Sequence, residues 1–156
     1  MSRELASVVL VGMGAVALAF VIGANIYEQM ICVPQWRTPE GMTTWRIMSS
    51  GIHPGHFFLT FAPTSLLLLG LGTAIGWNHP VERNLWALGA TAAVLAALIL
   101  TKVHFLPLNS LLFLHPPPEQ THEEVLAMLR SWVGANYVRV AIALGGLTSA
   151  LVALRR

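Results

Sequence analysis

Three polar side chains enter the last apolar segment of the chain at helical spacing. Trp132, Asn136 and Arg139 are four and then three residues apart, so a helix would place all three on one face. An arginine on a membrane-embedded face is costly unless it is paired or lines a polar cavity. In a dry pocket, a guanidinium and an amide could stabilise an oxyanion. The indole could hold a planar ligand, so we expect a binding pocket on this face.

Titratable side chains lie near the ends of the three preceding apolar segments. They are Glu28, His56 and His104. A histidine titrates near neutral pH, so His56 or an inward-facing His104 could act as a general base. Glu28 would orient that base or pair with Arg139. Either charge would be expensive at that depth if it were left alone, so the pair could also have a purely structural role.

The same groups could instead bind a metal. His53 and His56 are three residues apart, a spacing that occurs in metal sites. With Glu28 and His104 they could hold a transition metal such as iron or copper, although His53 could equally be a helix cap. The cofactor is therefore expected to be either none or a transition metal. The carboxylates are too few for a typical di-iron bundle.

Composition predicts an integral membrane protein. The chain has 156 residues, of which 55% are hydrophobic and 10% are charged, whereas soluble domains have about 25% charged residues. Four apolar runs approach the ~20 residues needed to cross a bilayer. We therefore predict a single all-α domain over residues 1–156, a multi-pass integral membrane four-helix bundle with a polar pocket at the face opposite the termini. The predicted spans cover approximately residues 5–30, 54–77, 84–106 and 131–154.

Local signals mark the ends and the packing faces of these helices. Thr121 with Glu124 predicts a capping box at the start of the last helix. Pro107 predicts the end of the third. Small residues recur at every fourth position in two spans, a pattern that allows close helix packing. They are Ala15, Ala19 and Gly23 in the first span, and Gly72 and Gly76 in the second.

Depth along the helices predicts where the polar groups meet. Counted from the terminal side at ~1.5 Å per residue, these polar side chains lie about 24–36 Å along their spans. This depth is near the far boundary of a hydrocarbon core about 30 Å thick. Four spans place both termini on one side, and a one-residue excess of arginine there slightly favours cytoplasmic termini. The groups at the far boundary are Glu28, His56, His104, Asn136 and Arg139.

Several function classes lack their sequence signals. The net charge is +2 and the only basic cluster is Arg155-Arg156, so nucleic acid is not an expected partner. No hydrolase-type nucleophile and base, glycine-rich phosphate loop or CxxC motif is visible. The expected partners are the lipid bilayer and a small lipophilic substrate, and an oligomer is possible.

Five short motifs occur in an order that resembles the anthrone-oxygenase-like family of small four-span membrane proteins. They are Tyr27-Glu28, Pro34-Gln35-Trp36, Phe57-Phe58, Pro107-Leu108-Asn109 and Arg130-Ser131-Trp132, followed by Asn136 and Arg139. The resemblance covers nearly the whole chain. Fungal members oxidise an anthrone to an anthraquinone with O₂, whereas many bacterial members have no assigned reaction. The His53/His56 pair is not part of the family pattern.

The resemblance implies a membrane oxidoreductase, a monooxygenase acting on a planar aromatic or lipophilic substrate. We expect the catalytic residues to be Glu28, His56, His104, Asn109, Asn136 and Arg139. We expect the substrate-binding residues to be Tyr27, Trp36 and Trp132. Two alternatives stay open. One is a metal- or haem-dependent membrane oxidoreductase that uses Glu28 and the histidines, and the other is a non-catalytic membrane subunit that stabilises a partner.

Overall fold

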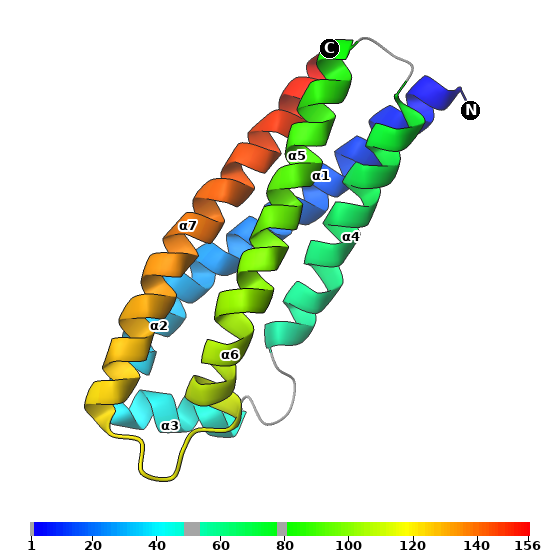
Figure 1. Cartoon of the computed structure of the whole chain (residues 1–156). Helices are drawn as coiled ribbons and strands as arrows, with labels where there is room; N and C mark the ends of the chain where they lie inside the picture. Colours follow the sequence, from blue (N-terminus) through cyan, green and yellow to red (C-terminus); the bar gives the residue numbers. More distant parts are fainter. Residues whose placement is uncertain (1, 49–53, 78–80) are drawn as a thin grey trace.

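Four long helices form the body of the protein (Figure 1). The computed structural model describes residues 2–48, 54–77 and 81–156, and this part contains no strand. The chain ends lie together at one end of the bundle, and the short helix α3 (Pro39–Met48) crosses the other end. The predicted all-α, membrane-spanning four-helix bundle is thereby confirmed. The long helices are α1 (Arg3–Tyr27), α4 (Pro54–Ile75), α5 (Val81–Leu100) and α7 (His122–Arg155).

Two of these helices continue beyond their α-helical segments. After α1 the chain passes through a π turn, η1 (Glu28–Cys32), into α2 (Val33–Trp36). After α5 it passes through η2 (Thr101–Phe105), α6 (Leu106–Asn109) and η3 (Ser110–Leu114). The spans therefore extend to Trp36 and Leu114, further than the ends predicted near residues 30 and 106.

The π turns explain why proline does not end these helices. A proline lacks an N–H, and in a regular α-helix its ring meets the carbonyl four residues earlier. A π turn closes just before Pro34 and another just before Pro107. In the first, the Val33 N–H donates to the Glu28 carbonyl, and in the second, the Leu106 N–H donates to the Thr101 carbonyl, in each case five residues back. The wider turn accommodates the ring, so the prediction that the third helix ends at Pro107 is wrong.

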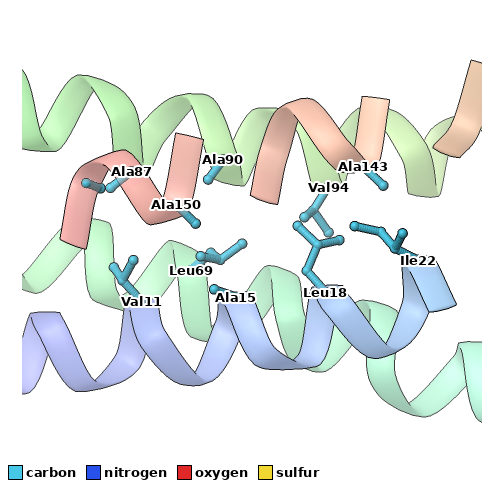
Figure 2. Close-up of a cluster of buried hydrophobic side chains, with 11 residues drawn as sticks. Val11, Ala15, Leu18, Ile22, Leu69, Ala87, Ala90, Val94, Ala143 and Ala150 are labelled. Atoms are coloured by element: carbon cyan, nitrogen blue, oxygen red, sulfur yellow. The ribbon is translucent and has the colours of Figure 1, made fainter. Parts of the chain in front are cut away.

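Buried apolar side chains from α1, α4, α5 and α7 pack together in one cluster between the long helices (Figure 2). Alanines from α1, α5 and α7 supply much of this core, so the helices approach closely and leave little space between them. The half of the bundle that carries the predicted pocket is built differently, around large aromatic rings. The capping box predicted at Thr121 and Glu124 is confirmed at the start of α7.

Glycines bring α4 into close contact with α1. The Ser7 hydroxyl donates to the Gly72 carbonyl at 2.7 Å, and a Cβ atom on Gly72 would lie 2.8 Å from a Val11 methyl carbon and 3.1 Å from its backbone nitrogen. The predicted close packing of Gly72 and Gly76 is confirmed. Of the stripe predicted on the first span, Ala15 is buried in the core, but Ala19 and Gly23 are exposed, and the face of α1 toward α4 runs through Gly14 instead.

We expect Gly72→Ala to destabilise the bundle. The added methyl group would meet the α1 backbone, and overpacking of this kind costs about 1–3 kcal/mol. The melting temperature in detergent should therefore fall. Gly23→Ala is the matched control, because a Cβ atom there meets nothing within 4 Å. Equal melting temperatures for the two variants would contradict the glycine-mediated contact between α1 and α4.

Candidate functional site

A cavity of about 500 Å³ lies between the four long helices, in the half of the bundle away from the termini. Most of its lining is aliphatic or aromatic. Helices α2, α3 and α6 contribute to the end of the cavity that is farthest from the chain termini. Helix α3 is held there by Arg46, which donates to the Leu112 carbonyl at 2.7 Å and to Gln120 Oε1 at 2.6 Å. The polar residues of the lining are Asn25, Glu28, His56, Thr101, Asn109 and Arg139.

Arg139 supplies the cation of the cavity. Its guanidinium carbon lies 3.8 Å from the centre of the Phe105 ring, so the planar group stacks on an aromatic face. Its Nη2 atom is 3.8 Å from Glu28 Oε2, a loose ion pair without a hydrogen bond. The side chains of Arg139 and Glu28 are only 8% and 14% exposed. The two charges therefore face each other in a largely water-excluded site.

Asn136 fixes the position of Arg139. Its Oδ1 accepts from Nη2 of the arginine at 2.8 Å and from Nε at 3.3 Å. Its Nδ2 donates to Gln29 Oε1 at 3.0 Å and to the Asn25 carbonyl at 3.3 Å. Asn136 is fully buried and ties α7 to the end of α1. Both ends of its amide are already engaged, so its role in this structure is to hold Arg139.

Aromatic rings line the end of the cavity that is farthest from the chain termini. The rings of Trp36 and Trp132 meet edge to face, with centroids 5.3 Å apart, and Phe113 packs on Trp36 at 4.8 Å. The Trp132 Nε1–H donates to Asn109 Oδ1 at 2.9 Å. This bond orients the indole across the cavity.

The structure brings most of the predicted site residues together. Glu28, Trp36, His56, Asn109, Trp132 and Arg139 all line the cavity, and Asn136 lies directly behind Arg139. His56 is exposed, at the edge of the cavity. Tyr27 lies outside the lining and is 59% exposed, because it precedes Glu28 by one position and so points about 100° away around the helix.

The predicted inward orientation of His104 is wrong. His104 is half-buried and lies outside the cavity lining, and its Nε2 atom is 3.4 Å from Ser131 Oγ. The π turn at Thr101–Phe105 changes the rotation per residue, so Phe105 is fully buried and Asn109 lines the cavity. A regular 3.6-residue period could not anticipate this shift.

Several residues of the site were missed at the sequence level. Asn25 and Gln29 are polar residues four apart in an apolar span, three before and one after Glu28, and this spacing was a usable signal. The sequence gives no such signal for Phe105 or Trp45. Phe105 faces the site because of a π turn, and Trp45 reaches it because of the path of α3.

The residues proposed as metal ligands are only partly described by the structure. Glu28 and His56 line the cavity, whereas His104 does not, and His53 lies outside the described residues. Within residues 2–48, 54–77 and 81–156, no three histidine, cysteine or acidic side chains come together in a possible metal site.

Comparison with known proteins identifies the family. The model of the anthrone oxygenase family matches residues 48–149, about two thirds of the chain. No curated protein and no solved structure matches the sequence. The matched region contains α4, α5 and α7 as far as residue 149, and with them Asn109, Trp132 and Arg139 of the cavity. The chain is therefore a multi-pass membrane protein that belongs to the anthrone oxygenase family.

Proposed function

We propose that this protein is a membrane oxidoreductase that oxidises a planar, lipophilic aromatic substrate of the anthrone type with O₂. The observation that carries the proposal is the cavity itself, an apolar space of about 500 Å³ that contains Arg139 facing Glu28 at 3.8 Å. A tricyclic aromatic ketone is of suitable size and polarity for such a space. The family match supports the oxidation chemistry.

The reaction needs a base and a group that stabilises an oxyanion. Removal of one methylene proton from an anthrone gives an enolate, which is electron-rich enough to pass an electron to O₂. Recombination forms a carbon–oxygen bond and, with the proton returned, a hydroperoxide at that carbon. Loss of the second proton from the same carbon breaks the O–O bond and leaves a carbonyl group. One oxygen atom of O₂ ends in the anthraquinone and the other in water, which balances the reaction.

We assign the proton transfers to Glu28. It lies within the cavity beside Arg139, whereas His56 lies at an exposed edge and His104 outside the lining. A carboxylate shielded from water can take the methylene proton and return it to the peroxide oxygen. This assignment replaces the histidine base expected from the sequence.

We assign the stabilisation of the enolate oxygen to Arg139. Asn136 already engages Nε and Nη2 of the guanidinium, and no hydrogen bond among the described residues uses Nη1. Nη1 therefore has two N–H groups for a substrate oxygen. A donor held in place in a dry site stabilises developing charge without reorganising. Trp36 and Trp132 would contact the ring faces or edges.

The test is oxidation of anthrone by the purified protein in detergent under air, followed as formation of anthraquinone. We expect Glu28→Gln to lower turnover about 100-fold or more, because loss of a general base costs 10²–10⁴-fold. His104→Gln is the control and should keep wild-type turnover. Loss of turnover in His104→Gln with full turnover in Glu28→Gln would reassign the base. A wild-type protein that leaves anthrone unchanged would refute the proposed function.

A further inference from the structure

A second hollow lies along α7, on a different face of the helix from the cavity. It is a groove of about 480 Å³, lined mainly by apolar side chains of α7 and by Arg37, the residue that follows α2. Arg130 also lines this groove. It precedes Trp132 by two positions and so points about 200° away from it around the helix. The proposed reaction therefore uses neither of these two arginines.

The guanidinium groups of Arg37 and Arg130 have no counter-ion in the protein. Both side chains are exposed, and the ion pairs among the described residues involve other arginines. In that part of the chain no side-chain hydrogen bond uses either guanidinium group. A guanidinium binds phosphate oxygens through a planar set of N–H donors. Two such groups on one groove predict an anionic ligand with phosphate oxygens.

Depth along α7 places the groove across the boundary between lipid headgroups and acyl chains. Counted from Arg155 at ~1.5 Å per residue, Arg130 lies ~38 Å along the helix and Tyr137 ~27 Å. The hydrocarbon core is about 30 Å thick, so Arg130 lies at headgroup level and Tyr137 lies among the acyl chains. Gly134 keeps the groove open between them, because a Cβ atom there would meet nothing within 4 Å.

We infer that this groove binds a phospholipid of net negative charge. Its phosphate contacts Arg37 and Arg130, and one acyl chain follows Val133, Gly134 and Tyr137 into the hydrocarbon core. Basic pockets between membrane helices bind anionic headgroups in this way. A lipid held there joins the end of α2 to α7 and stabilises the folded protein by binding it. The inference is independent of the proposed function, because no residue of the groove lines the cavity.

Two lipids with the same acyl chains test the role of charge. Wild-type protein in neutral detergent is titrated with dioleoyl phosphatidylglycerol or dioleoyl phosphatidylcholine, and bound lipid is counted by native mass spectrometry. We expect phosphatidylglycerol to bind about 30-fold more tightly, roughly fivefold for each basic residue. Arg37→Gln combined with Arg130→Gln should remove this preference. Arg3→Gln combined with Arg155→Gln is the control and should keep it, because these exposed arginines lie at the other end of the bundle.

The apolar part of the groove is tested by two glycines of the same helix. Gly134→Leu keeps both charges and fills the space of the acyl chain, so it should weaken binding of phosphatidylglycerol about tenfold. Gly145→Leu is the matched control. Gly145 also lies on α7, is exposed, has nothing within 4 Å of an added Cβ atom and lies outside the groove. This variant should bind the lipid as wild-type protein does.

The melting temperature in detergent provides a second readout, and phosphatidylglycerol should raise it more than phosphatidylcholine does. Equal affinity of wild-type protein for the two lipids would refute the site. So would an undiminished preference after loss of both groove arginines, or equal binding by the two glycine variants. Stabilisation by inorganic phosphate as large as that by phosphatidylglycerol would identify a soluble anion as the ligand and overturn the assignment to a lipid.

Discussion

Replacing Arg139 with methionine is expected to abolish oxidation of an anthrone and to destabilise the bundle. Methionine cannot stabilise an enolate oxygen, and loss of one such donor costs about 10²–10³-fold in turnover. The same change leaves the Glu28 carboxylate without its cation and Asn136 Oδ1 without its two donors. Removing one partner of a buried ion pair costs about 3–5 kcal/mol. Anthraquinone formation and the melting temperature in detergent are the two measurements.

Two further variants separate charge from geometry at this site. Arg139→Met combined with Glu28→Gln removes both charges, so its melting temperature should recover the part lost through the unpaired carboxylate while turnover stays absent. Asn136 Oδ1 still lacks its two donors in this variant. Arg139→Lys keeps the charge, but an ammonium cannot stack on Phe105 as the guanidinium does at 3.8 Å or present a planar set of donors. It should therefore also fail in turnover. A folded double variant with wild-type turnover would remove Arg139 from the catalytic site.

Asn136→Leu is expected to produce the largest loss of stability of any substitution considered. The side chain is fully buried and all four of its hydrogen bonds are made within the protein, two with Arg139 and one each with Gln29 and the Asn25 carbonyl. Leucine would leave the Arg139 guanidinium and the Gln29 amide oxygen without these bonds, at about 1–3 kcal/mol each and more for the charged group, whereas the Asn25 carbonyl still accepts from the Glu28 N–H. A large fall in melting temperature, or failure to fold, is the expected result.

The matched comparison is Asn25→Leu. Both asparagines are fully buried and both changes are identical, but Asn25 already has an unpaired oxygen. The melting temperature should therefore fall for Asn136→Leu and hold for Asn25→Leu. If both variants melt at the wild-type temperature, the asparagine–arginine network does not contribute to stability as the hydrogen bonds indicate.

The sequence alone determined the class of fold and most of the polar residues that line the cavity. Long uncharged runs cannot be solvated as loops and are stable only as spanning helices, so the four-helix membrane bundle followed from composition and spacing. Charged and polar groups in such runs are expensive, and their depths placed Glu28, Asn136 and Arg139 at one end. The structure brings these three together.

Only the tertiary structure decided which neighbours fill the site. The π turns before Pro34 and Pro107 change the helical phase by part of a turn, so Phe105 and Asn109 point inward in place of His104. No single-residue propensity specifies a π turn, because it forms where packing compensates for its weaker geometry. The unpaired atoms of Asn25 and Trp36 likewise depend on every side chain within hydrogen-bond reach. That information lies in the packed arrangement of all four helices and not in any one segment.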